Sequence, residues 1–377
     1  MWRLAVLAAV GCNAAPAPVE EPPRALGLND VSFLLPLPED PAAPVIATVE
    51  GLVRENLVAS IVFANNIAPK NGAAVAYRDF QIVAVRVDAC ARDQIGACPP
   101  STDGRLRLVL QPLFLRNGET FAHDIALHAF YAIPAADMPA VVDELRALAA
   151  LQDVPVTAPL GVNTGVADPA YRERLRALVL AYAGAEQLLK VTVIGQDALS
   201  AAFAWRMGGF ELRDGAFHTI AIPRLDGRTQ QHVLVAGGSV YHVRPSRDTP
   251  PGFSLALNPG VFATVTPDEQ RFVLEALAGI QNPNKHDAVD VQCAACHVAT
   301  FLERALATAA NIDPATLTER YVSPTFDLTI DNINLRDPRS VRAFGWAGNL
   351  PAISQRVAND TAHAIGDLEL VSATTNP

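Results

Sequence analysis

Three apolar segments follow one another in the first half of the chain, and they constrain the fold more than any other feature of the sequence. They read YRDFQIVAVRV (77–87), RLRLVLQPLFL (105–115) and FAHDIALHAFYAI (121–133). Each is rich in alternating or continuous apolar residues, which is typical of strands in a partly or fully buried sheet. We therefore expect three neighbouring strands.

Turn and cap residues predict further elements. Asp214-Gly215 separates two strand patterns in GGFELRDGAFHTIAI, and both residues tolerate the positive φ angles of a two-residue hairpin turn. Asp168 precedes a helical pattern that starts with proline, and Thr266 with Glu269 forms a capping box before another. Many strands with a few helices between them are therefore expected after the N-terminal segment, and helical character dominates toward the C-terminus.

The order of these signals predicts an α+β fold. A β-rich region with a few helices is expected at residues 26–265, and a mainly helical region at residues 266–377. The second region has the size of a small domain, yet it could also pack as a lobe of one larger domain. With 377 residues, half of them apolar, the chain can bury a sizeable core.

Charge excludes one class of partner. The formal net charge is −10, the pI is about 5.3, and no basic run occurs along the sequence. We expect no nucleic-acid binding, which requires a basic surface. Beyond the first dozen residues no apolar stretch approaches the roughly 18 residues of a membrane-spanning helix.

The first twelve residues have the layout of an export signal. Arg3 provides a basic start, residues 4–10 are apolar, and Gly11 precedes Cys12. This pattern resembles a bacterial lipoprotein signal, which implies lipidation of Cys12 and a periplasmic or cell-surface location. Residues 13–25, rich in Pro, Ala and Glu, then act as an extended tether. A plain signal peptide, or a start codon assigned in the wrong place, is the alternative.

Cys90 and Cys98 flank a short loop that contains Gly96 and follows a strand-like run. A local disulfide that closes this turn is geometrically easy and suits an oxidising compartment. Two unpaired or metal-binding thiols are the alternative.

The most informative motif for function is CAACH, with Cys293, Cys296 and His297. On a helix, residues three apart share a face, so both sulfur atoms and the neighbouring imidazole can meet one flat partner. The motif resembles the haem-attachment site of c-type cytochromes. The resemblance implies one covalent haem c, with thioether bonds from Cys293 and Cys296 and with His297 as an axial iron ligand.

Other chemistries for the same residues remain open. A thioredoxin-like site uses two cysteines at this spacing, but it normally has an aromatic residue before the first cysteine, where this chain has Asp290-Val291-Gln292. A structural zinc would need a fourth ligand, for which His286 is the candidate. A disulfide between Cys293 and Cys296 is the third alternative.

The second axial ligand is harder to predict. No methionine follows His297, and Met207 lies far upstream, so a methionine-ligated iron is not expected. His363 is the favoured ligand, with His286 as the alternative and an open iron as a third option. The remaining histidines are expected to be hydrogen-bonded or solvated side chains: His123, His128, His218, His232 and His242.

These features together predict an exported, membrane-tethered monohaem protein that passes single electrons to a redox partner protein. No Ser-His-Asp arrangement or other catalytic motif occurs, so electron transfer or binding is favoured over catalysis. Two alternatives remain. One is an open-site haem enzyme or sensor of peroxidase type, and the other is a haem-free structural or binding lipoprotein whose motif is a disulfide or zinc clip.

Overall fold

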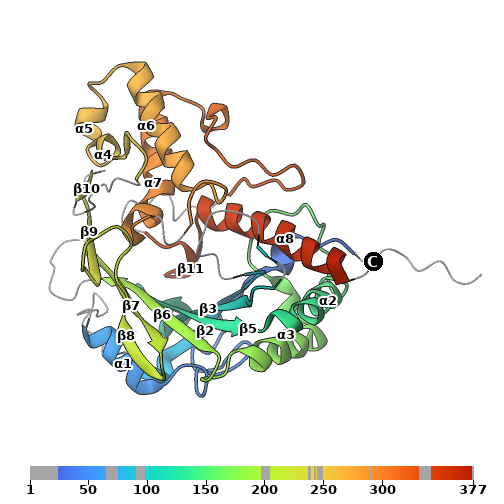
Figure 1. Cartoon of the computed structure of the whole chain (residues 1–377). Helices are drawn as coiled ribbons and strands as arrows, with labels where there is room; N and C mark the ends of the chain where they lie inside the picture. The colour runs from blue at the N-terminus through green and yellow to red at the C-terminus, as the bar shows by residue number, and fades with distance from the viewer. Residues whose placement is uncertain are drawn as a thin grey trace, which may run out of the picture.

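A large antiparallel sheet forms the centre of the protein (Figure 1). The computed structural model describes residues 24–64, 75–90, 98–99, 101–196, 204–236, 239–241, 243, 249–287, 291–330 and 341–375. The ten strands of the sheet are β1 (Ser32–Leu34), β2 (Phe80–Asp88), β3 (Gly104–Arg116), β4 (Glu119–Ala122), β5 (Ile125–Ile133), β6 (Leu188–Gln196), β7 (Ala204–Arg213), β8 (Ala216–Thr219), β9 (Gln230–Ala236) and β10 (Ser239–Tyr241). The expected α+β class, with a β-rich first part, is confirmed.

The strand order is β1-β2-β3-β5-β6-β7-β9-β10, with β4 paired to β3 and β8 paired to β7. The three expected strands are neighbours, but the third segment is divided into β4 and β5. The long strand β3 pairs with β5 over its first part and with β4 over its last four residues. Between β4 and β5, the backbone N–H of His123 donates to the carbonyl of Pro112 on β3. The pairing of β3 passes from β4 to β5 at this point.

The hairpin between β7 and β8 turns where the sequence predicted. Asp214 and Gly215 have φ angles of 51° and 74°, and Arg213 pairs with Ala216 across the turn. Positive φ at both central residues is the requirement of a type I′ turn, which matches the twist of the two strands. Local chemistry alone therefore determines this register.

The helices are α1 (Glu55–Ala64), α2 (Met138–Ala149), α3 (Pro169–Tyr182), α4 (Phe253–Ala256), α5 (Pro259–Phe262), α6 (Pro267–Ile280), α7 (Cys293–Ala310) and α8 (Gln355–Thr375). Asp168 caps α3 by accepting from the backbone N–H groups of Ala170 and Tyr171. Thr266 and Glu269 form the expected capping box at the start of α6. None of the described helices is long and apolar enough to span a membrane.

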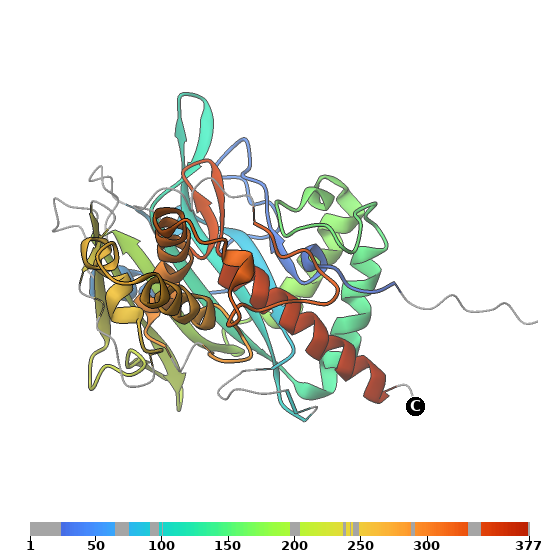
Figure 2. The same cartoon turned by 90° about the horizontal axis from the view of Figure 1, so that it is seen from above.

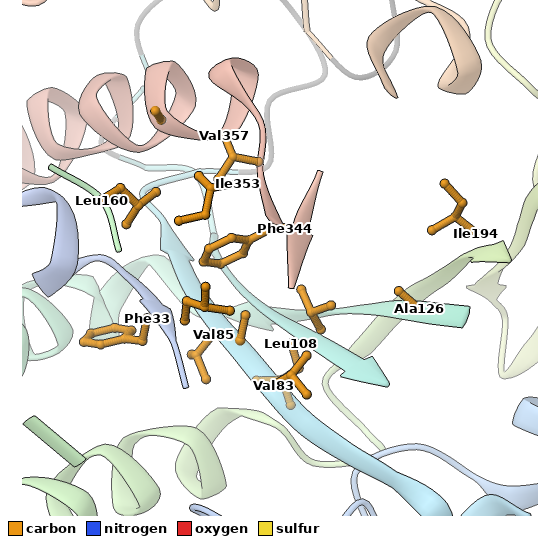
Figure 3. Packing of buried hydrophobic residues seen from close by; sticks show 14 of the residues in the cluster. Phe33, Val83, Val85, Leu108, Ala126, Leu160, Ile194, Phe344, Ile353 and Val357 are labelled. Atoms are coloured by element: carbon orange, nitrogen blue, oxygen red, sulfur yellow. The ribbon is translucent and has the colours of Figure 1, made fainter. Parts of the chain in front are cut away.

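The C-terminal region also contains a short hairpin that the sequence did not predict. Its strands β11 (Phe344–Ala347) and β12 (Leu350–Ile353) pack against the large sheet. Figure 3 shows Phe344, Ile353 and Val357 lying over the strands that carry Val85 and Leu108. One continuous cluster of buried apolar side chains runs from the first strands to α8, so both regions share a core.

Helices α7 and α8 lie over the same face of the sheet. Figure 1 shows both above the strands, and the view from above in Figure 2 shows them crossing the sheet, with α6 beside α7. Helix α1 lies on the opposite side in Figure 1. The motif at the start of α7 therefore faces the sheet from above.

Candidate functional site

The start of α7 is held to the sheet by a pair of glutamines. Gln231 of β9 accepts a hydrogen bond from the backbone N–H of Ala294 (2.9 Å) and donates to the side-chain carbonyl of Gln292 (2.8 Å). The first N–H groups of a helix have no partner within the helix, and Gln231 satisfies one of them from a strand 63 residues away. This contact sets the position of the first turn of α7, which carries the motif.

His297 is oriented by a backbone carbonyl. Its Nδ1 lies 2.7 Å from the oxygen of Val341. A carbonyl oxygen can only accept, so Nδ1 carries the proton and Nε2 keeps its lone pair. Metal-binding histidines commonly use one ring nitrogen in this way, which fixes the tautomer and the ring orientation. Burial also lowers the pKa of His297, so the neutral imidazole is the form present near neutral pH.

The two cysteines of the motif are free thiols. Burial, with a contribution from the neighbouring Cys296, raises the pKa of Cys293 to about 11, and burial also raises the pKa of Cys296. A reactive redox thiol needs a lowered pKa, because the thiolate is the nucleophile. The electrostatics of this pair therefore do not favour thioredoxin-like chemistry.

A cavity of about 480 Å³ lies beneath the motif. Its upper wall is formed by the first turn of α7 and by one face of α8, and its floor by the central strands of the sheet. Cys293, Cys296 and His297 all line it. Cofactor sites usually have volumes of about 300–1,000 Å³, and this cavity falls within that range.

Positive charge gathers on the floor of the cavity. The Phe130 ring of β5 has the guanidinium carbons of Arg107 and Arg105 at 4.9 and 5.5 Å from its centroid, and Lys190 Nζ at 4.8 Å. All four residues line the cavity. Arg105 is buried, and its Nε has no hydrogen-bond partner. Buried like charges are unfavourable together, so this cluster favours an anionic ligand.

Carboxylates neutralise part of this charge. Asp88 accepts from Arg86 (2.6 Å) and from Arg107 (3.3 Å). Burial alone would raise the pKa of Asp88, but the charges of Arg86 and Arg107 hold it below its ordinary value. On α8, Asp360 pairs with Arg356 at 2.7 Å. Glu211 of β7 also lines the cavity and pairs with Arg213. The strands of the floor therefore contribute five cations, Arg86, Arg105, Arg107, Lys190 and Arg213, against the two carboxylates of Asp88 and Glu211.

The candidate axial ligands are distributed unequally around the cavity. His363 of α8 lines it, whereas His286 is not among the described residues of its wall. The backbone carbonyl of His286 instead accepts from Arg356 Nη2 at 2.7 Å. Two residues that were not expected at the site also line the cavity, His128 of β5 and Met207 of β7.

The sequence predicted a hydrogen-bonded or solvated side chain at His128, and the second description applies. No hydrogen bond joins its ring to another described residue, and it keeps partial exposure on the cavity wall. Burial, with the charges of Arg107 and His297, lowers the pKa of His128 to about 3. The imidazoles of His128 and His297 are therefore both neutral near neutral pH.

The remaining predicted site residues are Cys12, Cys90 and Cys98. Cys12 lies outside the described residues. Cys90 and Cys98 are joined by a disulfide with an S–S distance of 2.01 Å, and Cys90 lies on the cavity wall. Within the described part of the chain, no three His, Cys, Asp or Glu side chains are grouped so that they could hold a metal ion.

Sequence reasoning missed His128, Met207 and the cationic floor for the same reason. Each depends on which strands are neighbours and which faces point toward α7. Alternation within 121–133 placed His128 and Phe130 on one face, but it did not say what that face meets.

Comparison with known proteins finds no match to a family model, a curated protein or a solved structure.

Proposed function

We propose that this chain is an exported c-type haem protein that transfers single electrons. The observation that carries the proposal is the joint position of Cys293, Cys296 and His297. All three line one cavity of cofactor size, and His297 is already held by Val341 in the tautomer that leaves Nε2 available to iron.

Cys293 and Cys296 would hold the haem by thioether bonds, and His297 would be an axial ligand. Haem supplies an iron centre that takes up or releases one electron. The protein contributes the buried site, the fixed imidazole and the surrounding charge. Buried thiols with raised pKa values suit a covalent anchor better than a redox pair.

The cationic floor supports the same proposal. Haem carries two propionate groups, and the site offers guanidinium and ammonium groups around Phe130. Arg105 Nε, buried and without a partner, suits a hydrogen bond to a carboxylate. A site without a bound anion would leave Arg105 Nε buried and without an acceptor.

Export and anchoring are part of the proposal. The Cys90–Cys98 disulfide is of the kind found in oxidising compartments. Lipidation of Cys12 would place the folded region on a membrane surface through the tether of residues 13–25. A redox protein in the same compartment would then be the electron donor or acceptor.

The test is expression of the full chain in a host that exports and matures c-type cytochromes. We expect a haem stain that survives denaturing electrophoresis, an alkaline pyridine spectrum typical of two thioether bonds, and the mass of one haem. Redox titration should follow a one-electron curve. The double variant Cys293→Ser/Cys296→Ser should lose the covalent haem, whereas the matched double variant Cys90→Ser/Cys98→Ser should keep it.

Other results would overturn parts of the proposal separately. Colourless protein without the added mass would leave only the haem-free alternatives. Covalent haem that turns over peroxide rapidly would favour the open-site enzyme. Cys12→Ser should move the protein from the membrane fraction to the soluble fraction with its haem content unchanged, and failure to do so would refute lipid anchoring alone.

A further inference from the structure

We infer that His128, from strand β5 of the sheet, is the second axial ligand of the iron. This inference rests on the proposed function and names a residue on the wall opposite His297. It makes the sheet a part of the haem site and gives the β-rich region a role in setting the redox properties of the iron.

The position of His128 follows from the register of the sheet. It pairs with Val109 on β3 and with Thr192 on β6, and Thr192 pairs with Gly209 on β7. Towards β7, this row therefore consists of small residues, with no side chain at Gly209. The imidazole is the largest group of the row on the cavity floor, and it keeps partial exposure there.

His363 is less suited to the role because of the wall from which it comes. An iron bound on one side by His297 needs its other ligand from the opposite side of the porphyrin. Helix α8, which carries His363, lies over the same face of the sheet as α7 (Figure 1). The ring of His363 also packs edge-on against Tyr321, at 6.2 Å and 76°, and Tyr321 does not line the cavity among the described residues.

Met207 also lies on the floor, but its surroundings are tighter. It is 2% exposed and pairs with Ile194 and Gln231, the residue that holds the start of α7. It is thus packed beneath the helix terminus. By contrast, no hydrogen bond joins the imidazole ring of His128 to another described residue.

The charged floor is consistent with this assignment. The row next to His128 pairs Arg107 with Phe130 and Phe130 with Lys190. Two residues along a strand span about 7 Å, so the imidazole and the cations lie side by side on the floor. Haem has its iron at the centre of the ring and its propionates at one edge. His128 as a ligand of the iron, with the neighbouring row of cations near the propionates, suits that distribution.

The test compares haem-loaded variants by spin state. We expect the wild-type oxidised protein to be six-coordinate and low-spin, with the electron paramagnetic resonance signal of two imidazole ligands. His128→Gln should be high-spin, should bind carbon monoxide when reduced, and should return to low-spin when imidazole is added. His363→Gln and Met207→Leu should keep the wild-type spectrum. His128→Met provides a second variant, whose oxidised spectrum should show the sulfur-to-iron charge-transfer band.

The outcomes separate this inference from the proposed function. An alkaline pyridine spectrum measured first on each variant shows whether covalent haem is present. With haem present, a low-spin His128→Gln protein would overturn the inference. So would loss of the low-spin signal in His363→Gln, a methionine band in the wild type that disappears in Met207→Leu, or a high-spin wild type. Absence of haem in all variants would instead refute the proposed function.

Discussion

Glu303 is a buried carboxyl on α7, the helix that begins with the Cys293-to-His297 motif, and its replacement by glutamine should change how stability depends on pH. It is 8% exposed and accepts a hydrogen bond from Gln281, the residue that follows α6, and Gln281 in turn accepts from Thr300 at 2.6 Å. Burial raises the pKa of Glu303 from 4.5 to about 7, although Gln281 and nearby arginines act in the opposite direction.

The size of the effect follows from the two pKa values. Below a pH of about 4 the carboxyl is protonated in both the folded and the unfolded chain, so it makes no difference to stability. Between about pH 4.5 and pH 7 it ionises only in the unfolded chain, and the free energy of unfolding falls. Each pH unit is worth about 1.4 kcal/mol, so the total loss is about 3 kcal/mol, and it stays constant above pH 7.

Glu303→Gln keeps the shape and a carbonyl that can accept from Gln281, but it cannot ionise. Urea unfolding of both proteins between about pH 4 and pH 8, followed by circular dichroism, measures the difference. The variant should be similar to the wild type near pH 4 and about 3 kcal/mol more stable, relative to it, near pH 8. Glu173→Gln, at an exposed position on α3, is the matched control and should follow the wild type. Parallel pH profiles for Glu303→Gln and the wild type would refute the reasoning.

Three further predictions concern the contacts around the cavity. Gln231→Leu leaves the first turn of α7 without its partner on the sheet, so the free energy of unfolding should fall by about 2 kcal/mol, and an unchanged urea midpoint would contradict the anchoring role. Asp88→Asn removes the carboxylate that Arg86 and Arg107 share and should cost about 3 kcal/mol at neutral pH. That difference should shrink in acid as the pH falls through the lowered pKa of Asp88, which unfolding at several pH values can check. Reducing the disulfide that closes the loop between Cys90 and Cys98, which are 8 residues apart, should cost about 2.5 kcal/mol, and thermal melts with and without reductant measure it in the Cys293→Ser/Cys296→Ser background.

Local features of this protein could be predicted because each depends on neighbouring residues. Asp214-Gly215 allows the positive φ angles of a hairpin turn, and Thr266 with Glu269 satisfies the first N–H groups of α6. The spacing of Cys293 and Cys296 places them on one helical face, and α7 indeed begins at Cys293. These interactions act over a few residues, so the order of amino acids is enough to determine them.

The surroundings of the motif depend instead on residues that are far away in the sequence. Val341 fixes the ring of His297 from 44 residues away, and Gln231 holds the start of the helix from 63 residues away. His128 and the cations around Phe130 reach the cavity only because β2, β3, β5 and β6 are neighbours with one particular register. The sequence by itself determined the first turn of α7 with Cys293, Cys296 and His297, and the strands of the three apolar segments. Only the tertiary structure decided which side chains face them, because strand order and register arise from packing between distant segments, which no local pattern specifies.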